Sequence, residues 1–265
     1  TNSIPLAAGG AILGVTISCI VSSLFLLGRF RKAYQVLPVT DDQPLPFWTT
    51  AKKLLKIAIP ITIGSAGLSF LIMIETNVFM GQLLGLGYSQ EKADTLKGIF
   101  DMTKTIYNMP CAFITPITVS IIPAITAQLT LKDHASVKST EESAARVTGL
   151  LALPCGVGMT LLAGPIASLR YSGVRLLVAT QLLQILGVCI FFYAGVLLFN
   201  AILQSHNYAH IPVINTVVCG MIRLGLVYYL TANPDINVIG IPLGGMFSFV
   251  SILLLDLFAI SRLVP

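Results

Sequence analysis

Ionisable side chains inside long apolar runs are the part of this sequence that bears most directly on chemistry. Five of them lie in segments apolar enough to cross a membrane, namely Glu75, Asp101, Lys104, Arg223 and Asp256. A charge is costly in bilayer hydrocarbon, so such a residue usually faces a bundle interior or a wet cavity. The sequence therefore predicts a polar site between helices.

Arg223 is the most informative of these residues, because it lies well inside an otherwise apolar span. A guanidinium there could clamp an anionic group such as phosphate through two parallel N–H donors. Alternatively, it could form an internal salt bridge, with Glu75 as one partner, or extend to the outer interface. Asn215 and Cys219 share its helical face, one turn apart.

Two further spans add amide and carboxylate groups. Glu75 and Asn77 flank a stripe of hydroxyl side chains, which could be a cavity wall or a helix–helix interface. The cost of an unpaired carboxylate in lipid favours the cavity. Asn200 and Gln204 lie one turn apart at the end of another span, on one face.

The remaining candidates lie nearer the ends of their spans. Asp101, Lys104 and Asn108 share one helical face, and Asp101 can pair with Lys104. This group could line a cavity or form an ion pair at the outer surface. We expect Asp256 at the cytoplasmic interface, close to Arg262.

No motif of soluble enzyme chemistry is present in the sequence, and no paired-cysteine metal site. The histidines, His134, His206 and His210, fall in predicted turns, where we expect solvated side chains rather than ligands. The five cysteines lie in apolar runs and should be small buried hydrophobic residues. We therefore expect no enzyme, no metal and no cofactor.

The composition indicates a membrane protein. Hydrophobic residues make up 55% of the chain and charged residues 10%, against roughly a quarter charged in soluble domains. Continuous apolar runs favour an all-α bundle over a membrane barrel, whose strands alternate. The net charge of +5 comes from basic residues between apolar runs. That distribution is typical of the positive-inside rule and not of nucleic-acid binding.

The apolar runs predict about seven transmembrane helices. We expect them at 3–28, 53–84, 95–130, 142–168, 175–204, 211–231 and 238–262. The bias of basic residues places 29–52 and 132–141 in the cytoplasm of a multi-pass cell-membrane protein.

An internal echo suggests a repeat. Ile4-Pro5-Leu6 and Ile241-Pro242-Leu243 each open a span that ends in Leu-Phe and then Arg. If this is not coincidence, residues 1–28 are a helix left from a first lobe, 29–52 are a cytoplasmic linker, and 53–265 form a complete six-helix lobe. Repeated bundles are common in transporters.

Several stretches resemble a known family. Residues 51–60 (AKKLLKIAIP) are similar to the entry to the seventh helix of the stage V sporulation protein B family. Residues 107–125 (YNMPCAFITPITVSIIPAI) are similar to its eighth helix. Residues 200–204 (NAILQ) with 211–215 (IPVIN) are similar to its tenth and eleventh helices. This family of polysaccharide-biosynthesis proteins belongs to the multidrug/oligosaccharidyl-lipid/polysaccharide exporter superfamily.

The resemblance implies a larger parent with two six-helix lobes around a V-shaped cavity, related to multidrug and toxin extrusion (MATE) proteins. This chain would hold the last helix of the first lobe and all of the second, and its partners would be the missing N-terminal lobe, membrane lipid and a lipid-linked glycan. The resemblance also implies an aspartate in the seventh helix, where this chain has Glu75.

Three functions are consistent with these patterns. The first is a flippase that moves lipid-linked oligosaccharide or polysaccharide precursors by alternating access, favoured by Arg223 and Lys104. The second is a cation-coupled multidrug exporter, which should need acidic and apolar walls. The third is a scaffold for envelope or spore assembly, in which Glu75 and Arg223 would face packed protein without a void.

Overall fold

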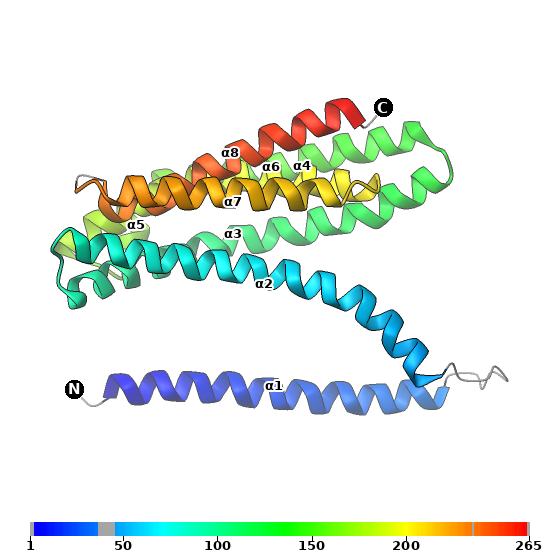
Figure 1. The fold of residues 1–265 in the computed structure, drawn as a ribbon, viewed down its shortest axis with the longest axis horizontal. Helices are drawn as coiled ribbons and strands as arrows, with labels where there is room; N and C mark the ends of the chain where they lie inside the picture. Colours follow the sequence, from blue (N-terminus) through cyan, green and yellow to red (C-terminus); the bar gives the residue numbers. More distant parts are fainter. Residues whose placement is uncertain (1–2, 37–45, 235, 264–265) are drawn as a thin grey trace. The chain divides into compact units, whose positions relative to one another are not determined.

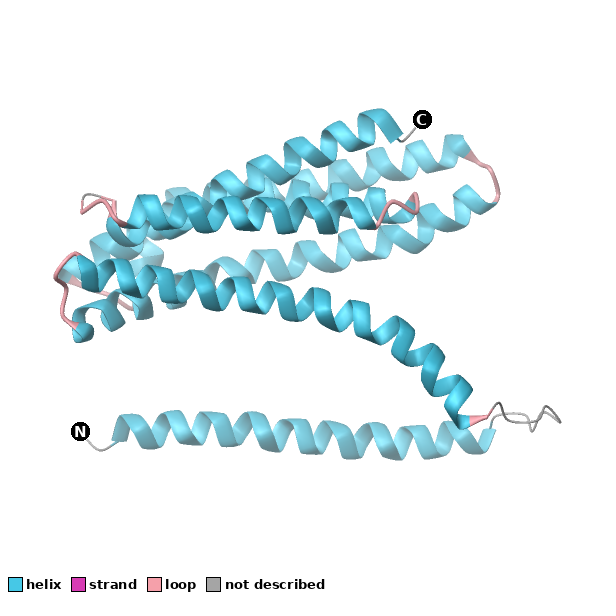
Figure 2. Cartoon of the chain, in the orientation of Figure 1, coloured by secondary structure: helices cyan, strands magenta, loops and turns pink. Residues whose placement is uncertain are grey.

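A computed structural model describes residues 3–36, 46–234 and 236–263. Within these ranges it also describes the side chains, except those of 3–8, 11, 33–36, 53 and 56–68. The chain is all-α. Helices and short loops account for the described residues, and no strand is found among them (Figure 2).

The helices follow the predicted order with different ends. They are α1 (Ser3–Val36), α2 (Phe47–Gly85), α3 (Gln90–Thr130), α4 (His134–Leu161), α5 (Ala163–Ser168), α6 (Gly173–Ser205), α7 (His210–Thr231), the 3-10 turn η1 (Asn237–Ile239) and α8 (Gly240–Leu263) (Figure 1). Because α1 ends at Val36 and α2 begins at Phe47, the connection is shorter than the predicted 29–52.

The predicted helix 142–168 is wrong in two respects. It begins at His134, where Asp133 caps it, and it is interrupted at Leu162, which separates α4 from α5. The Asp133 carboxylate accepts a hydrogen bond from the backbone N–H of Ser136 at 3.1 Å and from its hydroxyl at 2.6 Å. These bonds satisfy a donor of the first turn. They also hold the pKa of Asp133 below its usual range.

Six of the described helices are long and apolar enough to cross a membrane. They contain residues 12–32, 90–130, 134–161, 173–205, 210–231 and 237–263. Within α2 the described apolar stretch, Ser69–Gly85, is shorter. The protein is therefore a multi-pass membrane protein.

The chain divides into two units, Thr1–Ile57 and Ala58–Pro265, and the division falls inside α2. In the first unit, every described side chain of α1 is exposed, including large apolar ones such as Leu13 and Phe25. A helix that is apolar all round is stable against lipid or another protein, not against water. Cys19 lies on this exposed helix, so the prediction of a buried residue was wrong there.

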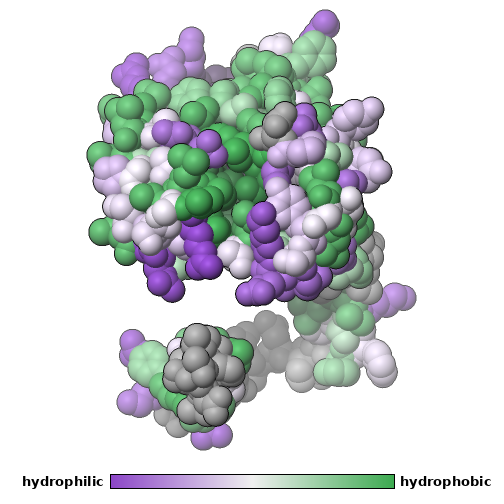
Figure 3. Space-filling view, turned by 90° about the vertical axis from the view of Figure 1, so that its left-hand side faces the viewer, coloured by the Kyte–Doolittle hydropathy of each residue, from purple (hydrophilic) through white to green (hydrophobic). Residues whose placement is uncertain are grey.

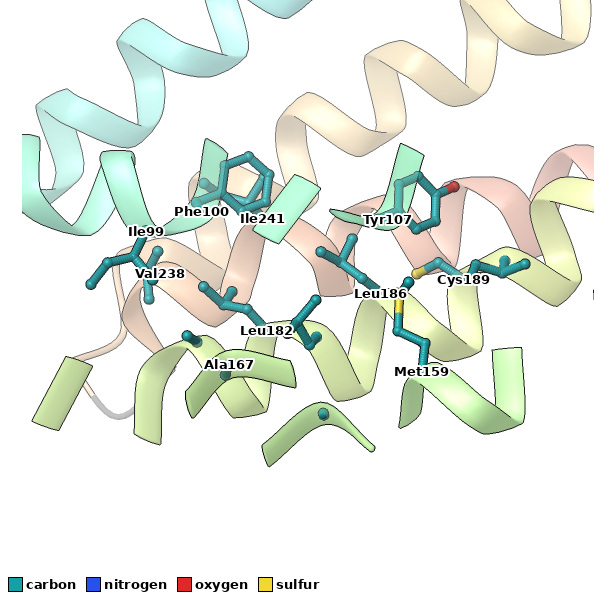
Figure 4. Close-up of a cluster of buried hydrophobic side chains, with 14 of the residues drawn as sticks. Ile99, Phe100, Tyr107, Met159, Ala167, Leu182, Leu186, Cys189, Val238 and Ile241 are labelled. Atoms are coloured by element: carbon teal, nitrogen blue, oxygen red, sulfur yellow. The ribbon is translucent and has the colours of Figure 1, made fainter. Parts of the chain in front are cut away.

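The second unit is a bundle in which α6 is central. Its backbone packs closely against α3, α4 and α8, and α7 packs on α8. α2 joins the core through Phe79 and Leu83, which are fully buried. Figure 4 shows part of this core, where Leu182 and Leu186 of α6 lie among side chains of α3, α4 and η1.

α4 and α6 cross closely at a pair of glycines. A Cβ atom added to Gly187 would lie 2.9 Å from the carbonyl oxygen of Gly156 and 2.8 Å from the backbone nitrogen of Thr160. Small residues allow backbones to approach in this way within membranes. The Thr160 hydroxyl donates to the Gly156 carbonyl at 2.8 Å and approaches that of Gln184 at 3.3 Å.

Polar side chains tie the helices together near the α3–α4 turn. Gln128 of α3 and Thr140 of α4 exchange hydrogen bonds of 3.0 and 3.1 Å. His206, which caps α6, lies 2.9 Å from Glu141 of α4, and its side chain is largely buried. The prediction of a solvated His206 was therefore wrong, because Glu141 is far away in sequence and is brought to it by the packing of α4 on α6.

The opposite end of the molecule has a mixed surface. Figure 3 looks onto the end that carries the α2–α3 and α7–α8 connections, where hydrophilic and hydrophobic side chains lie side by side. Along the helices, large apolar residues such as Phe113, Leu150 and Tyr229 are exposed. These side chains are expected to contact lipid.

Candidate functional site

A salt bridge joins α2 to α7 inside the second unit. Arg223 donates to the same Glu75 oxygen, Oε1, from Nε at 3.0 Å and from a terminal nitrogen at 2.8 Å. The two side chains are 27% and 12% exposed, so both charges are largely removed from solvent. Gly245 of α8 leaves space for the guanidinium, since a Cβ there would stand 3.7 Å from its central carbon.

A small cavity of about 60 Å³ borders this salt bridge. Besides Glu75 and Arg223, its charged lining residues come from α3: Lys97, Asp101 and Lys104. Ile72, Thr76, Phe79, Phe100 and Ile241 complete the wall. Two of the predicted charged groups, from α2 with α7 and from α3, therefore meet at one cavity.

The ion pair on α3 differs from the predicted one. Asp101 pairs with Lys97, at 2.6 Å, and not with Lys104. Both spacings place the side chains on neighbouring turns, and the sequence alone does not choose between them. Lys104 has no carboxylate partner among the described residues.

The lining holds three cations and two carboxylates, which leaves one positive charge in excess. The excess attracts anions most strongly beside Arg223 and Glu75, which are largely covered, and less beside Asp101, which is exposed to solvent. The arrangement suits an anionic group that enters beside Lys104 and competes with Glu75 for Arg223.

The predicted amides do not reach this cavity. Asn77 and Asn108 are exposed. Asn77 is two residues from Glu75 and therefore points to another side of α2. Gln204 is exposed as well. The Oδ1 atom of Asn200 is buried and has no hydrogen-bond partner among the described residues.

Asn215 and Arg223 bind different carboxylates: Arg223 binds Glu75, whereas Asn215 binds Asp256. The Asn215 side-chain amide donates to Oδ1 of Asp256 at 2.8 Å. Asp256 is fully buried, so its predicted place at the interface near Arg262 was wrong. The position of Asp256 near the end of its span suggested the interface, but α6 and α7 cover it.

A family model described as lipid II flippase MurJ matches residues 6–264. The chain belongs to this family. The membership places it in the superfamily predicted from the sequence, whereas the resemblance to the stage V sporulation protein B family is not confirmed.

A further relative is also described as a membrane protein. An uncharacterized membrane protein of Bacillus subtilis, YabM, is 25% identical over 212 residues, which is 78% of this chain and 38% of that protein. The chain thus spans less than half the length of this relative.

Two solved structures share the fold. One is described as a MATE protein in the straight conformation, with a TM-score of 0.66, and the other as an inward-facing multidrug resistance MATE transporter of the MOP superfamily, with 0.67. Both are 17% identical to this chain. The match covers 93% of it and 55% and 56% of theirs. The relatives named here are flippases or transporters where a function is given, and none is described as an enzyme.

Sequence reasoning missed Lys97 and the Asn215–Asp256 contact in this MurJ-family chain. The spacing of Lys97 and Asp101 was a usable signal, because i,i+4 pairs of opposite charge commonly interact. The partner of Asn215 has no local signal, since Asp256 lies on another helix. Among the described residues no group of three or more His, Cys, Asp or Glu side chains forms a metal site.

Proposed function

We propose that this chain is part of a flippase that carries a lipid-linked oligosaccharide or polysaccharide precursor across the cytoplasmic membrane by alternating access. One observation carries the proposal: the cavity between α2, α3 and α7 is lined by three cations and two carboxylates, and its Arg223–Glu75 pair is largely removed from solvent. A phosphate needs a compensating cation to enter a region of low dielectric. The match to a family described as lipid II flippase supports the same substrate class.

In this proposal the head group binds by exchange of partners. Lys104 meets the incoming phosphate first, since no described carboxylate pairs with it. Arg223 then turns its planar fork of donors from Glu75 to the phosphate oxygens, which it can bind through two parallel bonds. Glu75 is left without its partner, and this loss favours return of the salt bridge once the head group leaves.

The second unit forms half of the transporter in this proposal. Residues 53–265 are a six-helix lobe, and α1 is the last helix of a first lobe that closes the other side of a central cavity. The coverage of little more than half of each MATE structure supports this division. The missing lobe is then the main partner, and the connection between α1 and α2 and the 132–141 segment face the cytoplasm.

The alternatives are less favoured. A scaffold would have Glu75 and Arg223 in packed protein without a void, whereas both line a cavity. A cation-coupled multidrug exporter should need acidic and apolar walls, whereas the charged lining of this cavity has more cations than carboxylates.

The test is flipping of a fluorescent lipid-linked glycan in vesicles by the full-length protein. We expect Arg223→Ala to abolish flipping, Arg223→Lys to retain part of it, and Lys104→Met to weaken it. Lys138→Met, an exposed lysine away from the cavity, is the matched control. Normal flipping by Arg223→Ala at normal abundance would refute the role of Arg223.

A double variant separates substrate binding from a structural role. If Arg223 serves only to neutralise Glu75, removing both charges in Glu75→Gln/Arg223→Gln leaves no buried charge unpaired and should restore activity. If Arg223 binds the head group, the double variant stays inactive while its stability recovers. Thermal unfolding in detergent reports the stability.

A further inference from the structure

A second polar layer lies where α6, α7 and α8 meet. One turn before it, Val196, Cys219 and Ile252 form a buried apolar cluster with one residue from each of these helices. α6 and α8 run in the same direction and α7 runs in the opposite one (Figure 1). One helical turn further along, the same faces carry Asn200, Asn215 and Asp256.

Asp256 in this layer has an incomplete set of hydrogen bonds. It is fully buried. Its Oδ1 accepts from the Asn215 amide at 2.8 Å, but its Oδ2 has no partner among the described residues. The Oδ1 of Asn200 is also buried without a partner. Two acceptor oxygens of the layer, Asn200 Oδ1 and Asp256 Oδ2, are therefore without a hydrogen-bond donor in the part of the chain that the structure describes.

Among the described residues, no Lys, Arg or His side chain forms a salt bridge with the Asp256 carboxylate. The described groups that act on it electrostatically are the Asn215 amide and the Cys219 thiol, both from α7. Arg223, two helical turns from Asn215, is bound to Glu75, and Arg262 on α8 is exposed. From α6 the layer receives Asn200, which carries no charge. A buried carboxylate without a partner is strongly unfavourable in its ionised form.

We propose that Asp256 is a proton-binding site, with the proton carried on Oδ2 inside the layer formed with Asn200 and Asn215. On loading, hydronium at an aqueous opening gives its proton to Oδ2, an O–H bond forms, and water is left. On release, Oδ2 returns the proton to water. A proton suits this layer better than a metal ion. A metal ion binds several oxygen ligands, whereas only two oxygens of the layer, Asn200 Oδ1 and Asp256 Oδ2, are without a hydrogen-bond partner among the described residues.

The site is separate from the cavity at Arg223, and its occupancy does not depend on what the protein transports. Because the acid is fully covered, exchange of the proton requires the packing of α6, α7 and α8 to open. The layer therefore links protonation to the conformation of this half of the bundle.

The first experiment labels the full-length protein in membranes with dicyclohexylcarbodiimide, which reacts with protonated carboxyl groups in apolar surroundings. Mass spectrometry should locate the adduct on Asp256 and not on Asp101, which is exposed and paired with Lys97. Labelling should fall about tenfold for each pH unit above the midpoint of the group. Labelling of Asp256 that does not change with pH would overturn the proposal.

The second experiment does not require the reagent to reach the site. If the folded state holds a proton that the unfolded state releases, the contribution of Asp256 to the stability must fall as pH rises above about 4, and the difference between the wild type and a variant without this acid isolates it. Asp256→Asn keeps the shape of the neutral acid and should be as stable as the wild type near pH 4, with a flatter pH dependence. Equal pH slopes for the two proteins would overturn the proposal. So would stabilisation by Na⁺ that disappears in Asp256→Asn, because it would assign the layer to a metal ion.

Discussion

Replacing Gly187 with alanine should destabilise the bundle, although alanine is the better helix former. The substitution favours the helix by roughly 0.5–1 kcal/mol. The added Cβ would lie 2.9 Å from the Gly156 carbonyl oxygen and 2.8 Å from the Thr160 nitrogen. Both are backbone atoms, so α4 and α6 must move apart. Overpacking of this kind costs about 1–3 kcal/mol. The net expectation is a loss of about 1–2 kcal/mol.

Gly158 provides the matched control in the same region. A Cβ added there meets nothing within 4 Å, so Gly158→Ala should show the helix gain alone. The assay is thermal unfolding of the purified protein in detergent, where each kcal/mol corresponds to roughly 2–4 °C for a chain of this size. The two variants should shift in opposite directions. If Gly187→Ala proved as stable as Gly158→Ala, the close crossing of α4 and α6 would be refuted.

Three further outcomes are expected. Because the pKa of Asp133 is lowered in the folded state, its capping of α4 is present above about pH 4 and is lost as pH falls further. The protection of the first turn of α4 against hydrogen exchange, taken relative to the intrinsic rate at each pH, should therefore fall at low pH in the wild type and less so in Asp133→Asn, and an equal loss of protection in both would contradict the cap. His206→Ala should destabilise the protein by about 1–2 kcal/mol by leaving Glu141 without its partner, measured by chemical unfolding, and an unchanged midpoint would count against the contact. In a Cys19→Ser background, an impermeant thiol reagent outside the cell should label Ser89→Cys and not Ser139→Cys, and the reverse pattern would invert the topology.

The fold was largely predictable because its main signal is local. Apolar runs of membrane-spanning length specify helices, since a backbone in lipid must satisfy its own hydrogen bonds. The ends of the helices were less predictable. α1 extends past Arg29 to Val36 and α4 begins at His134. Both ends lie in polar sequence, where hydropathy does not indicate whether the chain is helical. There, caps such as Asp133 decide the boundary.

The site was predictable in part. The rule that buried charges need partners indicated Glu75 for Arg223, and the structure contains that pair. The same rule applies to Asp256, which accepts a hydrogen bond from Asn215 on the preceding helix. What the sequence lacks is the rotation of each helix about its own axis, which decides whether Asn215 faces Arg223's cavity or Asp256. That rotation is fixed by packing across helices and not by spacing along one.

The prolines of α3 divide this helix into two parts of different stiffness. Pro110, Pro116 and Pro123 all lie in its second half. Each lacks the N–H that would bond the carbonyl one turn earlier, so resistance to bending is lowest around these residues. The turns before Ile106, which carry Lys97 and Lys104, contain no proline. α3 can therefore bend in the part that contains the prolines, while the part that carries the charged residues stays straight. Bending beyond Pro110 would leave the spacing of the charges unchanged.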